Sequence, residues 1–235
     1  ATVGAEKREY VSINDIPKNI TDAVLSTEDT RFQSHIGIDP IRLIKALLVN
    51  IRSNSAQQGA STITQQVVKN SLLTSDKSLQ RKIQEAYLSL KLENRYSKDD
   101  ILEMYMNKIY YSDGQYGIKT AAKYFYNKEL NQLTLPQVAL LTGIPQQPIL
   151  YNPYDYPEQA KERRDTVLYA LLNNDKITET EYNDAINTPI TDGIVEKTKE
   201  ERANQHTYNP KFAAYIDQIT KELKENQNFE KQCYL

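Results

Sequence analysis

The segment Ser97-Lys-Asp-Asp-Ile-Leu-Glu-Met-Tyr-Met-Asn107 contains the clearest helix start in this sequence. Ser97 and Asp100 have the spacing of a capping box, in which each side chain binds the backbone N–H group of the other residue. The spacing therefore predicts a helix over residues 101–107. The same start signal recurs at Thr134 with Gln137 and at Thr178 with Glu181.

Helical patterns dominate outside these capped segments as well. Asp39-Pro40 predicts the start of a helix that runs to Arg52, with its apolar residues on one face. Two more helices are predicted over residues 157–172 and 212–223. The exceptions are a short strand near Tyr10–Ile13, a loop over 53–61 and, because of three prolines, an extended path over 143–153. The sequence thus predicts a mainly α fold.

Composition excludes several classes of protein. The 235 residues include 31 acidic and 29 basic side chains, a net charge of −2. A near-neutral surface is unsuited to a polyanion, so we expect no nucleic acid among the partners. Only 7 glycines are present, which argues against an all-β fold or a Rossmann domain, because their turns and phosphate loops need glycine. No stretch reaches the roughly 20 apolar residues of a membrane-spanning helix.

Cysteine and histidine are scarce. Cys233 is the single cysteine, which excludes an intrachain disulfide and a cysteine-built metal centre. The two histidines, His35 and His206, make a histidine-rich metal centre unexpected. The first residues read like the middle of a protein, so we expect a piece cut from a longer chain.

A first polar cluster spans Thr27–Gly37 and follows the apolar residues 23–25. A general base needs a carboxylate held partly out of water with charged neighbours, and Glu28 fits that description. The alternative is an ordinary helix end, with Asp29 and Arg31 in solvated contacts.

A second cluster, Gly59–Lys69, combines three hydroxyl side chains, paired glutamines and a lysine. Such groups donate hydrogen bonds to sugar or phosphate oxygens. A serine- and threonine-rich helix N-terminus would explain the hydroxyls, but it explains the paired glutamines less well.

A third cluster places Lys77, Arg81 and Glu85 four residues apart, on one face of a helix. This row could bind a pyrophosphate directly, or through a divalent ion held by Glu85. The alternative is a surface pair of Arg81 and Glu85 worth at most about 0.5 kcal/mol.

Taken together, the three clusters resemble the motifs of the peptidoglycan glycosyltransferases, family 51, found in class A penicillin-binding proteins. The first family motif, E-D-x-x-F-x-x-H-x-G, is matched over residues 28–37. The second, G-x-S-T-x-T-Q-Q, is matched over 59–66, and the third, R-K-x-x-E, over 81–85. Residues 101–107 and 139–148 resemble the fourth and fifth motifs. The likeness covers roughly residues 5–205.

The resemblance implies a lysozyme-like, two-lobed α fold with a membrane-facing smaller lobe. It implies polymerisation of lipid II into glycan strands, with inversion at the anomeric carbon and release of undecaprenyl pyrophosphate. Implied partners are lipid II, the growing glycan strand, the membrane surface, moenomycin-type inhibitors and other cell-wall synthesis proteins. The implied location is the outer face of the bacterial cytoplasmic membrane.

The resemblance also assigns roles to residues. Glu28 would be the general base, and Glu85 a second catalytic carboxylate that holds a divalent cation, Mg²⁺ or Mn²⁺. The expected substrate-binding residues are Asp29, Phe32, His35, Ser61, Thr62, Thr64, Gln65, Gln66, Lys69, Lys77, Arg81 and Lys82. Lys77 and Gln84 stand where some members have arginine and lysine, which reduces the charge or the bidentate reach available at the pyrophosphate.

The likeness divides the chain into a glycosyltransferase domain over residues 1–205 and a linker over 206–235 that leads toward a transpeptidase domain. The helix from Asp39 to Arg52 could pack in the core or dip its apolar face into the bilayer, and a lipid substrate favours the second. No S-x-x-K motif is present, so β-lactam binding by this chain is not expected.

Two other functions compete with a polymerase. A lysozyme-like hydrolase or lytic transglycosylase shares a single catalytic glutamate, but cutting an uncharged glycan needs no pyrophosphate site. A catalytically silent docking module would be free to lose Glu28 or Glu85, and both are present. The product discriminates among the three: longer glycan, shorter glycan or unchanged glycan.

Overall fold

The computed structural model describes residues 9–44, 61–72 and 78–203. Its α-helices are α1 (Lys18–Glu28), α3 (Ile63–Leu72), α4 (Leu79–Arg95), α5 (Lys98–Lys108), α6 (Ile118–Tyr126), α7 (Leu135–Gly143), α8 (Pro157–Asn173), α9 (Glu179–Asn187) and α10 (Lys199–Ala203). Short 3₁₀ helices are η1 (Ile13–Asp15), η2 (Phe32–Ser34), η3 (Leu130–Gln132) and η4 (Ile144–Gln146). The described β structure is a single bridge between Tyr110 and Tyr116. The mainly α fold predicted from the sequence is confirmed.

The capping signals read from the sequence are also confirmed. Ser97 accepts a hydrogen bond from the backbone of Asp100, whose side chain accepts one from Ser97 in return. The same reciprocal caps start α7 at Thr134 and α9 at Thr178. Asp39 Oδ1 accepts hydrogen bonds from the N–H groups of Ile41 and Arg42, so the helix predicted from Asp39 begins as expected over residues 40–44.

Several sequence predictions lie outside the described residues. They are the remainder of the Asp39–Arg52 helix, most of the loop over 53–61, the helix over 212–223 and the linker over 206–235.

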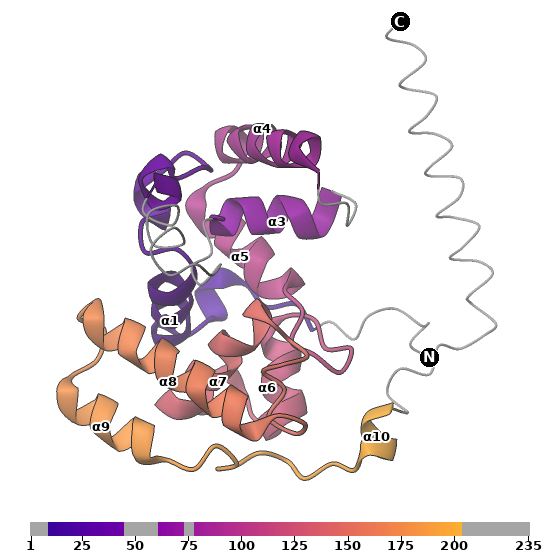
Figure 1. Ribbon diagram of the computed structural model, residues 1–235, viewed down its shortest axis with the longest axis vertical. Helices are drawn as coiled ribbons and strands as arrows, with labels where there is room; N and C mark the ends of the chain where they lie inside the picture. The colour runs from indigo at the N-terminus through magenta and orange to yellow at the C-terminus, as the bar shows by residue number, and fades with distance from the viewer. Residues whose placement is uncertain (1–8, 45–60, 73–77, 204–235) are drawn as a thin grey trace, which may run out of the picture. The chain divides into compact units, whose positions relative to one another are not determined.

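Two groups of packed helices lie within the compact unit that runs from Arg8 to Val195 (Figure 1). In one group α7 and α8 pack on each other and α1 lies against both. In the other, α3 packs on α4 and α5. The fully buried residues of α5, Ile101 and Met106, join the same hydrophobic core as Ile63 of α3 and Ile20 of α1. One continuous core therefore holds the helices that carry the candidate site.

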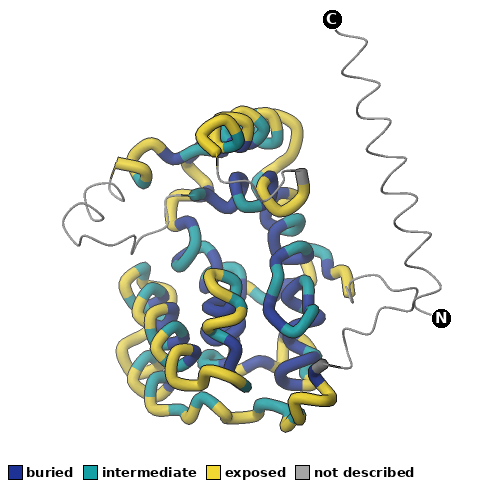
Figure 2. Tube along the Cα trace, turned by 45° about the vertical axis from the view of Figure 1, so that its right-hand side comes forward, coloured by how far each residue is buried: buried dark blue, intermediate teal, exposed yellow. Residues whose placement is uncertain are grey.

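Helix α4 departs from the usual pattern of burial. Its buried residues are Glu85 and Ser89, whereas Leu79, Ile83 and Tyr87 are exposed. Figure 2 shows α4 at the top of the molecule, largely exposed. No helix among the described residues combines the length and the apolar character needed to cross a membrane.

The strand predicted near Tyr10–Ile13 is wrong. Val11 donates its N–H to the side-chain oxygen of Asn107 at 2.9 Å, and its carbonyl accepts from the same side-chain amide at 2.8 Å. One asparagine on α5 thus supplies the backbone partners that a neighbouring strand would supply, and no ladder forms.

The extended path predicted over residues 143–153 is also wrong. Residues 144–146 form η4, and turns follow it. Pro145 lies in the first turn of η4, where its missing N–H group costs no hydrogen bond. The prolines therefore end α7 without extending the chain.

Gly37 makes a close approach between the first-motif loop and α4. Its φ is +102°, and a Cβ atom there would lie 2.6 Å from the backbone oxygen of Ser89. Its own carbonyl accepts a hydrogen bond from Thr62 Oγ1 at 2.6 Å. A side chain at this position is excluded both by the backbone conformation and by the neighbouring helix.

We expect Gly37→Ala to lower the free energy of unfolding by roughly 2–4 kcal/mol, because it adds backbone strain and overpacks a close contact. Urea denaturation followed by circular dichroism measures the change. The control is Thr30→Ala, at an exposed position in the same loop, which should alter stability by less than about 0.5 kcal/mol. Equal midpoints for the two variants would contradict this reading of Gly37.

Candidate active site

The side chain of Glu28, the last residue of α1, is held by two other helices. Gln66 Nε2 of α3 donates to Glu28 Oε2 at 2.9 Å. The guanidinium of Arg163, on α8, lies 3.3 Å from Glu28 Oε1. The Glu28 side chain is 13% exposed. Each oxygen of an ionised carboxylate can accept a further hydrogen bond, so Glu28 is oriented and still able to take a proton.

Two buried tyrosines lie close enough to Glu28 to feel its charge. Burial raises the pKa of Tyr105 and of Tyr111, and the negative charge of Glu28 raises both further. Both phenols therefore stay protonated at neutral pH. They add a low-dielectric wall to the site and no competing base.

Asp29, next to Glu28, is buried and joins three segments. Its Oδ2 lies 2.8 Å from His35 Nε2 and accepts the N–H of Ile63 at 3.0 Å. Arg42 lies 3.6 Å from its other oxygen. His35 Nδ1 accepts the N–H of Gly37 at 3.0 Å, so the imidazole proton sits on Nε2 and is donated to Asp29. Asp29 and His35 thus form a fixed internal pair.

The start of α3 is built from the second motif. Thr62 and Gln65 cap each other's backbone N–H groups, at 3.0 and 3.1 Å. Thr64 Oγ1 donates to Glu93 of α4 at 2.6 Å. These side chains are buried, and their hydrogen bonds are all made to other groups of the protein.

A second charged cluster surrounds Glu85 of α4, which is 1% exposed. Arg81 NH1 donates to one of its oxygens at 3.2 Å, and Lys82 donates to the other. Lys82 also contacts Ser61 Oγ at 3.1 Å, which ties α4 to the segment before α3. The Lys82 side chain is 46% exposed, so its ammonium group can reach a ligand.

A divalent cation does not fit this donor set. Both oxygens of Glu85 already face a cationic side chain, and a metal would add positive charge beside two positive charges. Across residues 9–44, 61–72 and 78–203, no group of three or more His, Cys, Asp or Glu could hold a metal. The described residues therefore do not support a metal held by Glu85.

The structure separates the predicted substrate-binding residues into three sets. Asp29, Phe32, His35, Thr62, Thr64 and Gln65 are buried. Ser61, Gln66, Lys69, Arg81 and Lys82 are partly or fully exposed. Lys77 lies outside the described residues. Helix α3 links the two charged clusters, because Gln66 reaches Glu28 while Ser61, just before the helix, reaches Lys82.

Sequence reasoning missed Arg163 and Arg42. Arg163 lies in the segment predicted as an amphipathic helix, where a charged residue gives no sign of a buried contact. Arg42 donates to the backbone carbonyl of Glu28. The sequence sign of Arg163 was the glycine at position 143 in the fifth motif. A larger residue would be excluded there, because its Cβ atom would lie 2.9 Å from Arg163 Cγ.

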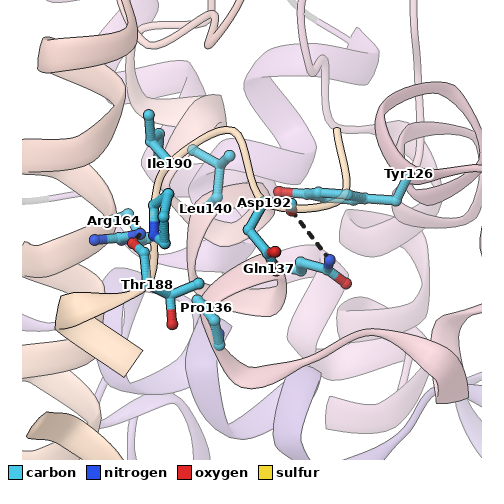
Figure 3. Close-up of a pocket in the computed structure, with 9 residues that line it drawn as sticks. Tyr126, Pro136, Gln137, Leu140, Arg164, Thr188, Ile190 and Asp192 are labelled. Carbon is cyan, nitrogen blue, oxygen red and sulfur yellow. Dashed lines mark hydrogen bonds between the residues drawn. The ribbon is translucent and has the colours of Figure 1, made fainter. Parts of the chain in front are cut away.

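The cavity in Figure 3 is not this site. It holds about 10 Å³ between α6, α7, α8 and residues 188–192, and Gln137 Nε2 donates across it to the carbonyl of Asp192 at 3.3 Å. That volume accommodates about one water molecule. Its lining contains none of the predicted site residues.

Comparisons with known proteins agree with the motifs. The family model described as Transglycosylase matches residues 1–172. The chain belongs to the transglycosylase family. Penicillin-binding protein 1A/1B of Bacillus subtilis is 45% identical over 230 residues, which are 97% of this chain and 25% of that protein. Penicillin-binding protein 1A of Streptococcus pneumoniae is 45% identical over 226 residues, 95% of this chain and 30% of that protein.

The fold of this transglycosylase is similar to a solved structure. The crystal structure of penicillin-binding protein 1A from Haemophilus influenzae superposes with a TM-score of 0.50 and 25% identity, over 80% of this chain and 19% of that chain. The chain therefore spans less than a third of the length of these relatives. The predicted family, its helical fold and its enzyme class, a peptidoglycan glycosyltransferase, are confirmed.

We expect Asp29→Asn to destabilise this transglycosylase domain by about 1.5–3 kcal/mol, because a buried charged acceptor loses strength toward its donors. Thermal and urea unfolding measure the loss. Asp184→Asn, at an exposed position on α9, is the matched control and should stay close to the parent protein. A variant as stable as the control would show that the buried contacts of Asp29 do not need its charge.

Proposed function

We propose that this transglycosylase domain polymerises lipid II into glycan strands, with Glu28 as the general base. The observation that supports this is the state of Glu28. Its carboxylate is largely buried and oriented by Gln66 and Arg163, yet it keeps free acceptor positions on both oxygens. The motif match places the same residue first in the family pattern.

In the proposed reaction, Glu28 accepts the proton of the 4-hydroxyl group of the acceptor N-acetylglucosamine. That oxygen forms a bond to C1 of the donor N-acetylmuramic acid. The bond from C1 to the pyrophosphate oxygen breaks, and undecaprenyl pyrophosphate leaves with the electron pair. Attack on the face opposite the leaving group inverts the anomeric carbon.

The charge that develops on the pyrophosphate needs cations, and α4 supplies two of them. Arg81 and Lys82 are fixed by Glu85, so their charges are in place before substrate binds. Lys69, exposed on α3, and Lys77 are proposed to add to the same field. In this proposal Glu85 acts by holding Arg81 and Lys82.

The remaining motif residues fall into two proposed roles. Ser61 and Gln66 bind the donor side of the substrate, whereas the buried Gln65 caps the start of α3 together with Thr62. The buried residues Asp29, Phe32, His35, Thr62 and Thr64 fix the ends of α1 and α3 and so position Glu28 and Gln66.

Exposed apolar side chains support a site at a membrane surface. Ile41, Leu43 and Ile44 are 44–58% exposed on the helix that follows Asp39. Apolar side chains exposed on one helix are favourable at a lipid interface. We propose that the domain works at the outer face of the bacterial cytoplasmic membrane.

The further partners and the domain limits are proposals of the same kind. They are moenomycin-type inhibitors in the site, other cell-wall synthesis proteins, a glycosyltransferase domain over residues 1–205, and a linker over 206–235 toward a transpeptidase domain.

The test of the base is the fate of labelled lipid II in detergent. We expect the parent chain to form polymer and Glu28→Gln to lose at least about 100-fold in rate, the usual contribution of a general base. Glu158→Gln, an exposed carboxylate on α8, is the control and should retain activity. Polymer from Glu28→Gln at the parent rate would exclude Glu28 as the base and direct attention to Glu85. Shorter glycan from a glycan substrate would indicate a hydrolase instead.

The test of the leaving-group cations is a comparison within α4. We expect Arg81→Met to lower the rate at subsaturating lipid II by about 10-fold or more, because a charge-assisted contact to phosphate is lost. Arg95→Met removes an exposed arginine from the same helix and should have little effect. Equal rates for the two variants would remove Arg81 from the proposed pyrophosphate site.

A further inference from the structure

Arg163 has three neighbours that fix its guanidinium group beside Glu28. One terminal nitrogen lies 3.3 Å from Glu28 Oε1, and Nε donates to the carbonyl of Gly143 at 3.3 Å. The guanidinium carbon lies 5.9 Å from the ring centre of Tyr151. The side chain is 11% exposed. An arginine shielded from water on this scale is held in one place, unlike a surface arginine.

Gly143 provides the space and part of the charge complementarity. It ends α7, where the last carbonyl groups carry partial negative charge that favours a cation. Its lack of a side chain admits the stem of Arg163, because a Cβ there would come within 2.9 Å of Arg163 Cγ. The position of the guanidinium is thus set by α7 and Tyr151 as well as by Glu28.

The pair is shielded on both sides. Glu28 and Arg163 are 13% and 11% exposed, and the phenols of Tyr105 and Tyr111, near Glu28, are uncharged. Gln66 is neutral, so it orients Glu28 without balancing its charge. Removing one partner of a shielded ion pair leaves the other charge uncompensated, which is costly.

We infer that Arg163 is a positioning residue for the general base, an inference that rests on the proposed function. It balances the charge of Glu28 and fixes the plane of the carboxylate from α8, while Gln66 fixes it from α3. The oxygen positions that remain free then face the acceptor hydroxyl in one orientation. Arg163 itself touches neither sugar nor pyrophosphate in this role.

A positioning role predicts a specific kinetic change. Arg163→Ala should lower kcat for lipid II polymerisation by about 100-fold, the scale of a misplaced base, with KM changed by less than about threefold. Arg163→Lys keeps the charge but cannot contact Glu28 and Gly143 with one planar fork, so about a 10-fold loss is expected. Lys161→Ala, which removes an exposed charge that pairs with Asp165 on the same helix, is the control and should match the parent.

Chemical rescue separates positioning from support of the fold. Millimolar guanidinium chloride should restore part of the rate of Arg163→Ala, and sodium chloride at equal ionic strength should not. Circular dichroism melting of each variant checks that the helices are intact. Loss of kcat without rescue, together with a lowered melting temperature in both Arg163→Ala and Arg163→Lys, would assign Arg163 to the fold and overturn the inference.

Two further outcomes keep this inference distinct from the proposed function. Parent-like rates for Arg163→Ala, beside an inactive Glu28→Gln, would overturn the role of Arg163 and leave the polymerase intact. A parent chain that makes no polymer under conditions where a related polymerase does would overturn the proposed function, and the inference with it.

Discussion

The site depends on the hydrogen bonds that the buried carboxylate of Asp29 accepts. It receives the imidazole N–H of His35 and the backbone N–H of Ile63, and it has almost no contact with water. A buried charge needs donors inside the protein, so Asp29 ties together the end of α1, the loop to His35 and the start of α3. This connection places Gln66, one turn into α3, against Glu28. The first two motifs are thereby held together, with the Glu28 carboxylate 2.9 Å from the Gln66 amide.

Three acidic side chains in this region have different surroundings, and the surroundings separate their roles. Asp29 and Glu85 are each 1% exposed. Asp29 Oδ2 and both oxygens of Glu85 accept hydrogen bonds from internal donors, and Asp29 Oδ1 lies 3.6 Å from Arg42. Glu28 has one cation and one amide as partners and remains partly open to solvent. Only Glu28 combines a fixed orientation with room for an incoming hydroxyl group. The proposal of Glu28 as the base thus rests on partners and exposure together, whereas the residue type alone leaves three candidates.

Local signals in the sequence were enough to predict the helix starts, because a capping box depends on residues three apart. Ser97, Thr134 and Thr178 begin helices as predicted. Two of the misses came from contacts that are distant in sequence. Asn107 replaces a strand as the partner of Val11 across 96 residues, and Arg163 reaches Glu28 across 135. The four-residue spacing correctly placed Arg81 beside Glu85, whereas no sequence signal paired Gln66 with Glu28. The motifs could not show that His35 and Thr62 are buried, because a motif records which residues occur and not which atoms face solvent.

Helix α4 buries polar residues and exposes apolar ones, and this arrangement connects its charged cluster to the surface of the molecule. At 100° per residue, Leu79, Ile83 and Tyr87 lie on one side of the helix, and Arg81 and Glu85 lie on nearly the opposite side. Burying Glu85 inward is stable because Arg81 and Lys82 balance its charge, and this arrangement leaves the apolar side facing outward. Outward apolar groups on a helix are costly in water and favourable at a lipid surface. The ion pairs that stabilise Glu85 and the exposure of Leu79 are then two consequences of one helix orientation.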